Sequence, residues 1–231
     1  MMLKSPYFEA AATPAQGAWA TKRRLAAAIR KINASLVTTD APEEQLLLAA
    51  EAAERFAASL DAHPHRHGVR GFAEASLSGD IGAFFDQSPL IGLCNPVSPP
   101  MYLDAGSENV SGTVTFGAPY EGPPGHVHGG FIAAAFDEIL GLAQCTTGKP
   151  GMTGTLSVRY RAPTPLHTPL RLSARVDRVV GRKIFTVGTM HVGETLTAEA
   201  QALFVSVDHK RFSDLMARSA SDTAEPSDTG G

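Results

Sequence analysis

The chain has 231 residues, of which 43% are hydrophobic and 19% charged, a composition typical of a globular protein and not of a disordered one. Its formal net charge of −3 offers no basic surface for nucleic acid or for an anionic membrane. It has two cysteines and no apolar run near the roughly 18 residues that span a bilayer, so we expect a cytoplasmic protein without a disulfide framework that acts on a small molecule.

Two helices are predicted in the first quarter of the chain. Apolar residues recur at three- and four-residue spacing over residues 25–32 and again over residues 46–60. Asp40 is placed to cap the second helix, with Pro42 in its first turn. These signals predict a pair of helices joined by a short loop.

Residues 64–100 are rich in Gly, Pro and Ser and show no sustained period, so we predict a connecting segment with one short helix near residues 81–85. After it, the pattern changes to strands. We divide the chain into a helical extension and linker (1–94), one globular domain (95–210) and a tail that is expected to be disordered (211–231).

The globular domain is predicted to contain strands around one long helix. Residues 129–143 form that helix, and it is apolar almost all round, so it must be covered on nearly every side. Val192-Gly193-Glu194 is expected to be a tight turn between the last two strands. Strand-like runs occur at residues 110–116, 156–160, 170–177, 183–191 and 195–207. One helix with an antiparallel meander predicts an α+β fold in which the sheet curls around the helix.

The most informative residues lie at the start of this helix. His128-Gly129-Gly130 follows a Pro- and Gly-rich turn, and Asp137 stands further along the apolar helix. A glycine at a helix start lets a carbonyl group approach a free backbone N–H, which stabilises an oxyanion. A carboxylate can activate water or attack the carbonyl carbon itself. Together these residues indicate acyl-transfer chemistry.

The spacing within this helix has a further consequence. Asp137 lies eight residues beyond Gly129, about 12 Å along the helix axis, which is too far for both to act on one carbon atom within one chain. Two such helices packed antiparallel in a two-fold dimer would place Asp137 of one copy beside Gly129 of the other. Thr153, at the start of the next strand, could orient the water or the carboxylate. If these residues share a site, the chain acts as a dimer.

These residues, with the strand 155–162 that ends in Arg-Ala-Pro-Thr-Pro, resemble the hotdog-fold acyl-CoA thioesterases of the phenylacetate-pathway and human thioesterase-superfamily type. The resemblance covers roughly residues 95–207 and implies a hotdog fold, in which a curved antiparallel sheet wraps one long helix. It implies these roles: Gly129 as oxyanion donor, Asp137 as catalytic carboxylate, Thr153 as assisting hydroxyl and His128 as the motif histidine beside the carbonyl.

By the same resemblance, the substrate is an acyl-CoA of lipid metabolism that is hydrolysed to a carboxylic acid and CoA. Coenzyme A then enters as part of the substrate, no metal or redox cofactor is expected, and the assembly is a homodimer or a dimer of dimers. Arg159 and Arg161 could meet the phosphates of coenzyme A. Gly130 and Glu138 are further candidates for substrate binding, and Glu138 is also the alternative catalytic carboxylate.

Other interpretations stay open at this point. His63, His65 and His67 are closely spaced, but they lie in a Pro-containing loop where we expect solvated side chains and not a metal site. Cys145 has no apparent basic partner, so we expect a core residue and not a nucleophile. A hotdog enoyl-thioester hydratase would show an Asp-x-x-x-x-His pattern, which does not occur around the helix. A non-catalytic module that binds or senses acyl-CoA would keep the fold without turnover.

Overall fold

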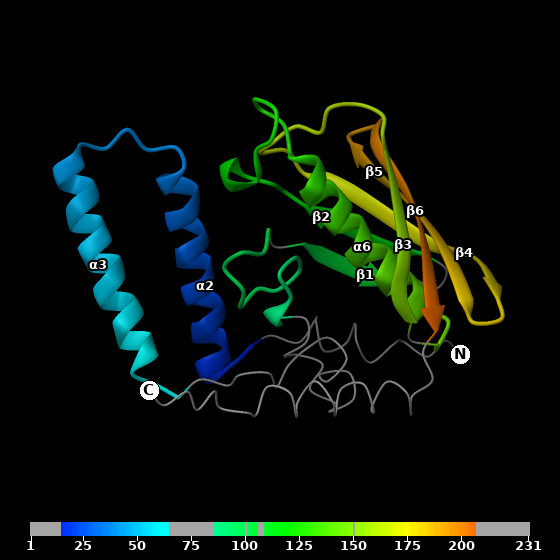
Figure 1. The fold of residues 1–231 in the computed structure, drawn as a ribbon, viewed down its shortest axis with the longest axis horizontal. Coiled ribbons are helices and arrows are strands. Elements are labelled where there is room, and N and C mark those ends of the chain that lie inside the picture. Colours follow the sequence, from blue (N-terminus) through cyan, green and yellow to red (C-terminus); the bar gives the residue numbers. More distant parts are fainter. Residues whose placement is uncertain (1–14, 65–85, 100, 106–108, 150, 207–231) are drawn as a thin grey trace, which may run out of the picture.

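The computed structural model describes residues 15–64, 86–99, 101–105, 109–149 and 151–206. It consists of a pair of long helices beside a curved sheet that holds one helix (Figure 1). The short helix predicted near residues 81–85, His65 and His67, and the tail 211–231 lie outside the described residues.

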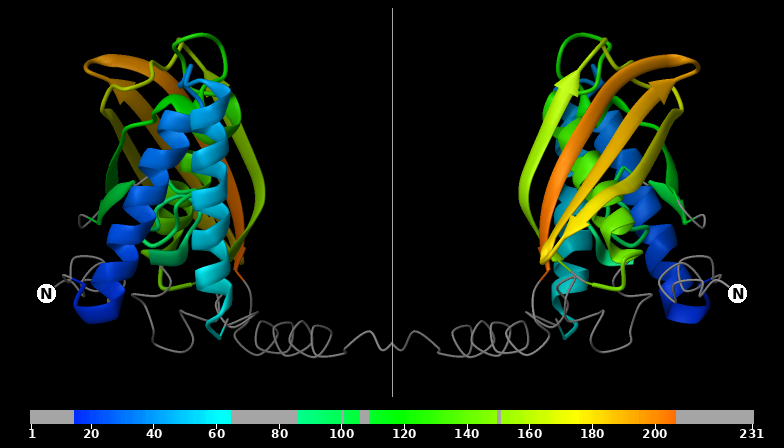
Figure 2. Two further views of the ribbon diagram at one scale, coloured as in Figure 1. Left: turned by 90° about the vertical axis from the view of Figure 1, so that its left-hand side faces the viewer. Right: turned by 90° about the vertical axis from the view of Figure 1, so that its right-hand side faces the viewer.

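Six strands form one antiparallel sheet in the order β1-β2-β4-β5-β6-β3. Helix α6 (Gly129–Cys145) follows β2 and lies against the concave face of the sheet (Figures 1 and 2). The strands are β1 (Tyr102–Ala105), β2 (Val110–Val114), β3 (Gly151–Tyr160), β4 (Leu170–Val180), β5 (Lys183–Val192) and β6 (Thr195–Ser206). The predicted α+β fold with a sheet curled around one helix is confirmed, as is the tight turn between β5 and β6, where Gly193 has a φ of +53°.

Strand β1 is missing from the sequence-based prediction, which starts the sheet at residue 110. The four residues of β1 show no apolar alternation, so only their pairing with β2 reveals the strand. Leu103 lies opposite Gly112, where a Cβ atom would come within 2.7 Å of the Leu103 side chain. Glycine at 112 therefore lets the edge strand approach β2 closely.

The hydrophobic core lies between α6 and the sheet. Phe136, Ile139 and Leu140 of α6 are 0% exposed, and they belong to the same core cluster as Leu170 and Ile184 of the sheet. Asp137 and Glu138 of α6 are only partly buried. Within one chain the helix therefore keeps an accessible side, and Asp137 stands on it.

The two predicted helices are α2 (Gly17–Leu36) and α3 (Glu43–Asp61). Helix α2 contacts segment 86–99 through polar bonds: Asp86 is 3% exposed and accepts hydrogen bonds from Trp19 and from Arg23. The prediction that Asp40 caps α3 is wrong, because Pro42 is the N-cap residue and its ring holds the extended entry into the helix. None of the helices in the described part combines the length and apolar character that a membrane span requires.

Candidate active site

The turn before α6 is held by close backbone contacts. The short 3-10 helix η1 (Ala118–Tyr120) leads into it, and the N–H of His128 donates to the carbonyl of Tyr120 at 2.9 Å. A Cβ atom at Gly122 would lie 2.7 Å from the Cα of His128, so only glycine allows the two segments to come this close. Gly125 turns the chain with a φ of +73°. These contacts fix His128 at the start of α6.

His128 is the N-cap residue of α6, and its ring uses one of the glycine N–H groups. The Nδ1 atom accepts the N–H of Gly130 at 3.0 Å, so the neutral ring carries its proton on Nε2. The N–H of Gly129 has no acceptor within the described part of the chain, and no acidic residue stands in the first turn. The Gly129 N–H is therefore an unpaired donor at the positive end of the helix.

Tyr160 of β3 lies against the same helix start. Its hydroxyl donates to the carbonyl of Gly129 at 2.8 Å, and a Cβ atom on Gly129 would lie 3.2 Å from that hydroxyl oxygen. The ring is 53% exposed. The sequence predicts Tyr160 only as a strand residue and does not predict this contact, because 31 residues separate the two positions and nothing in their spacing signals it.

The predicted carboxylate and hydroxyl meet further along α6. Thr153 Oγ1 donates to Asp137 Oδ1 at 3.0 Å. Thr153 lies on β3, which forms the opposite edge of the sheet from β1, at a point where the register with β6 shifts between Thr153 and Thr155. Such a bulge redirects the side chains beside it. Asp137 is partly buried and Thr153 is exposed, so this pair stands on the open side of α6.

Glu138 faces a different part of the chain. Ser88 Oγ donates to Glu138 Oε1 at 2.9 Å, and the same Ser88 oxygen accepts the N–H groups of Leu90 and Ile91. Burial raises the pKa of Glu138, the neighbouring Asp137 raises it further, and the Ser88 hydrogen bond opposes both. Glu138 thus joins α6 to segment 86–99, a contact that the sequence does not predict.

Arg159 and Arg161, the predicted phosphate contacts, both lie on β3 and share one partner. Arg159 Nη1 is 3.5 Å from Glu199 Oε1, and Arg161 binds the same oxygen. Their side chains are 70% and 44% exposed. Two positive charges therefore stand at the surface beside one carboxylate.

The remaining candidates for chemistry have ordinary surroundings. Burial raises the pKa of the Cys145 thiol to about 11, so it is protonated at neutral pH and a poor nucleophile. Among the residues that the structure describes, no three His, Cys, Asp or Glu side chains gather as a metal site.

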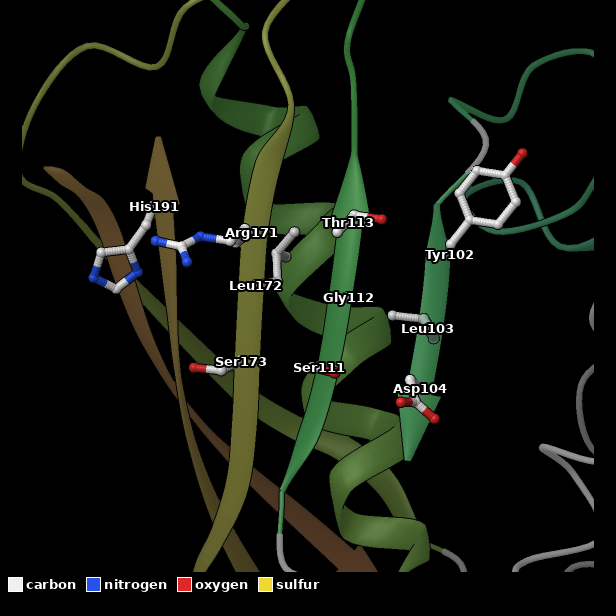
Figure 3. Close-up of a pocket in the computed structure, with 10 residues that line it drawn as sticks. All are labelled: Tyr102, Leu103, Asp104, Ser111, Gly112, Thr113, Arg171, Leu172, Ser173 and His191. Atoms are coloured by element: carbon white, nitrogen blue, oxygen red, sulfur yellow. The ribbon is translucent and has the colours of Figure 1, made fainter. Parts of the chain in front are cut away.

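A cavity of about 530 Å³ lies on the face of the sheet opposite α6 (Figure 3). Exposed side chains of β1, β2 and β4 surround it, including Asp104, Thr113 and Arg171. None of the predicted site residues lines this cavity. The helix start and the Asp137–Thr153 pair are thus separate from it.

Comparison with known proteins places this geometry in a family. The thioesterase superfamily model (4HBT) matches residues 124–199, from the turn before α6 into β6. Acyl-coenzyme A thioesterase THEM4 of Xenopus laevis is 38% identical over 92 residues, or 38% of this chain and 41% of that protein. THEM4 of Bos taurus is 37% identical over 100 residues, which are 42% of this chain and 41% of that protein. The match thus spans about two fifths of the length of these curated relatives.

A solved structure matches over a larger part of the chain. It is the crystal structure of a thioesterase superfamily protein that is 34% identical, with a TM-score of 0.72. The match covers 84% of this chain and 97% of the other. The identity and the coverage together show that the chain belongs to the thioesterase superfamily.

Proposed function

We propose that this chain is an acyl-CoA thioesterase that hydrolyses a thioester to a carboxylic acid and CoA. One observation carries the proposal: a single apolar helix holds an unpaired Gly129 N–H at its start and a carboxylate, Asp137, that is bound by the Thr153 hydroxyl. The relatives named acyl-coenzyme A thioesterase support the substrate class. Cys94 and Cys145 are free thiols, which fits a cytoplasmic location.

The active site in this proposal is shared between two copies of the chain. Gly129 and Asp137 are separated by eight residues of one helix, about 12 Å, so each needs its counterpart from a second copy. Among the described strands, β3 is paired on one side only, and its Met152 is 55% exposed. Two copies joined along β3 with antiparallel α6 helices would form two equivalent sites, as a homodimer or within a dimer of dimers.

In each site, the Gly129 N–H holds the thioester oxygen as negative charge develops on it. Asp137 removes a proton from water, whose oxygen bonds to the carbonyl carbon, and Thr153 keeps the carboxylate in position. The C–S bond then breaks, and the CoA sulfur leaves with the proton that Asp137 held. In the other role open to it, Asp137 attacks the carbon directly, the C–S bond breaks and an anhydride forms. Water then cleaves the anhydride, which gives the carboxylic acid, restores the Asp137 carboxylate and supplies the proton that the CoA sulfur takes. Neither route uses a metal or redox cofactor.

The other predicted contacts have supporting roles in this mechanism. Gly130 supports the His128 cap, and Glu138 holds segment 86–99 against α6 beside the substrate. Arg159 and Arg161 meet the phosphates of coenzyme A, because two guanidinium groups beside one carboxylate leave a net positive charge.

The test is release of free thiol from short, medium, long and aromatic acyl-CoAs. Wild type is compared with Asp137→Asn, and Asp40→Asn in the exposed loop between α2 and α3 is the matched control. We expect Asp137→Asn to lower turnover by about two to four orders of magnitude, the effect of losing a general base, and the control to keep wild-type turnover. Folded wild type that releases no thiol would contradict the proposal and favour a binding module. Full turnover by Asp137→Asn would move the catalytic role to Glu138.

A further inference from the structure

Helix α3 has no packing partner in the described part of the chain. It is the outermost element in Figure 1, and all of its 19 residues are exposed. This exposure is unusual because many of its side chains are apolar. Its large apolar side chains include Leu46, Phe56 and Leu60, which are 40%, 39% and 40% exposed. Isolated helices of this length are marginal in water, so helices of this kind are normally stabilised by packing. Helix α3 therefore requires another surface that packs against its apolar side chains.

Five apolar residues of α3 form a stripe, from which Leu47 and Leu48 lie apart, and helix α2 has a similar stripe. Both stripes have the alternating three- and four-residue spacing of helices that pack side by side in bundles. On α2, Ile32 and Leu36 are 57% and 62% exposed, on a different face from the side chains that bind segment 86–99. The α3 stripe consists of Leu46, Ala49, Ala53, Phe56 and Leu60, and the α2 stripe consists of Leu25, Ile29, Ile32 and Leu36.

The charges of the two helices are complementary. Helix α2 contains five Lys or Arg residues and no Asp or Glu, whereas α3 contains five Asp or Glu residues and one Arg. Arg24 and Lys31 of α2 are exposed and form no ion pair within the described residues, and they flank the α2 stripe. Glu54 of α3 is exposed as well. An acidic α3 disfavours an anionic lipid or nucleic acid as its partner and favours a basic helix such as α2.

The match to the solved relative extends into the part of the chain that holds the helical pair. Residues 86–231 make up 146 of the 231 residues, or 63% of the chain, yet the match to that crystal structure covers 84% of the chain. The match therefore extends into the region before residue 86, where α2 and α3 lie. The region that holds α2 and α3 is therefore not peculiar to this chain.

We propose that α2 and α3 form a self-association surface, in which the α3 stripe of one copy packs against the α2 stripe of a second copy. The reciprocal contact completes a four-helix bundle, so each copy presents the same surface to the other. This proposal does not rest on the thioesterase activity, because none of these residues belongs to the proposed active site.

The first test measures assembly mass by sedimentation, with two alanines of α3 as matched sites. Ala53→Glu places a charge on the α3 stripe, and Ala58→Glu places the same charge on the opposite face of the helix. Both changes keep a good helix former and the same net charge. We expect Ala53→Glu to weaken association at least about tenfold and Ala58→Glu to leave it unchanged. Equal masses for Ala53→Glu and wild type would overturn the proposal, and thiol release by both variants is recorded separately.

The second test identifies what covers α3. Chains with Ile32→Cys and chains with Ala53→Cys are mixed and treated with a short bis-maleimide, and wild type gives the background from Cys94 and Cys145. A two-chain product in the mixture supports the contact between copies. In the double variant Ile32→Cys/Ala53→Cys, a cross-link within one chain, and no two-chain product in the mixture, would show instead that α3 closes on its own α2. No cross-link in either sample would likewise overturn the proposal.

Discussion

Helices α6 and α3 differ in how much of their surface is buried by the rest of the same chain. Helix α6 has 17 residues and buries eight of them, whereas α3 has 19 residues and buries none. Both contain runs of apolar residues, and both were predicted as helices from that pattern. The sheet curls around α6, whereas α2, the described element beside α3 in Figure 1, leaves every residue of α3 exposed. An apolar stripe on a helix thus predicts that the stripe is buried. Only the fold shows whether it is buried within its own chain.

The two helix starts differ as well. Helix α3 begins with Glu43 and Glu44, whose carboxylates complement the positive end of the helix. Helix α6 begins with two glycines, has no acidic residue in its first turn and leaves the Gly129 N–H unpaired. The start of α6 is therefore free to stabilise an oxyanion, while α3 satisfies its own dipole with side chains.

The largest expected effect compares one phenylalanine from each helix. Phe136→Ala in α6 removes a side chain that is 0% exposed and should lower the free energy of unfolding by about 3–5 kcal/mol at any protein concentration. Phe56→Ala in α3 should lower the free energy of unfolding little in the dissociated chain. The loss should increase with protein concentration, because the α3 stripe is then covered by a second copy. Denaturant unfolding at two protein concentrations measures both. A large effect of Phe56→Ala that is independent of concentration would mean that α3 packs within its own chain.

The next prediction isolates the backbone donor at the start of α6. Gly129→Pro removes the N–H, and proline is well accepted at the first position of a helix. Gly129→Ala keeps the N–H but adds a Cβ atom near Tyr160, as proline does, and is the matched control. We expect turnover of Gly129→Pro to fall about 10²–10³-fold below that of Gly129→Ala, the effect of losing one oxyanion donor. Equal turnover of the two variants would exclude this N–H from the mechanism.

A smaller effect is expected from Tyr160→Phe, which removes the hydrogen bond to the Gly129 carbonyl and keeps the ring. A bond of this kind contributes about 0.5–1.5 kcal/mol, so kcat should fall by roughly twofold to tenfold with little change in KM. Steady-state thiol release provides both constants. Tyr160 acts here as a positioning residue, and a change confined to KM would indicate instead that it binds the substrate.

The smallest effect concerns pH. Burial raises the pKa of Glu138 above its ordinary value of 4.5, so the native state holds more protons than the unfolded state just above that pH. The contribution of Glu138 to stability therefore falls as pH rises through the raised pKa. Glu138→Gln should be more stable than wild type at neutral pH, and the difference should shrink as pH falls towards 4.5. Thermal unfolding across this pH range checks the prediction, with Glu54→Gln on α3 as the matched control. A stability difference between Glu138→Gln and wild type that does not vary with pH would contradict the prediction.

Much of the fold was predictable because its signals are local. The apolar period of α6, the alternation in β4 to β6 and the turn at Gly193 each lie within one short stretch of sequence. Strand β1 has too few residues to show a pattern, and the contacts of Tyr160 with Gly129 and of Ser88 with Glu138 join segments 31 and 50 residues apart. The Asp137–Thr153 contact was expected from the family resemblance. The exposure of α3 was not predictable, because its stripe looks like that of any packed helix.

The central claim is that Gly129 and Asp137 act together from two copies of the chain. It is tested most directly by mixing Asp137→Asn chains with Gly129→Pro chains, refolding them together and measuring thiol release. With random pairing, half of the dimers are mixed, and each of these contains one site in which both residues are intact. The account predicts recovery of about one quarter of wild-type turnover, although each variant alone is nearly inactive. A mixture no more active than the separate variants would contradict a shared site.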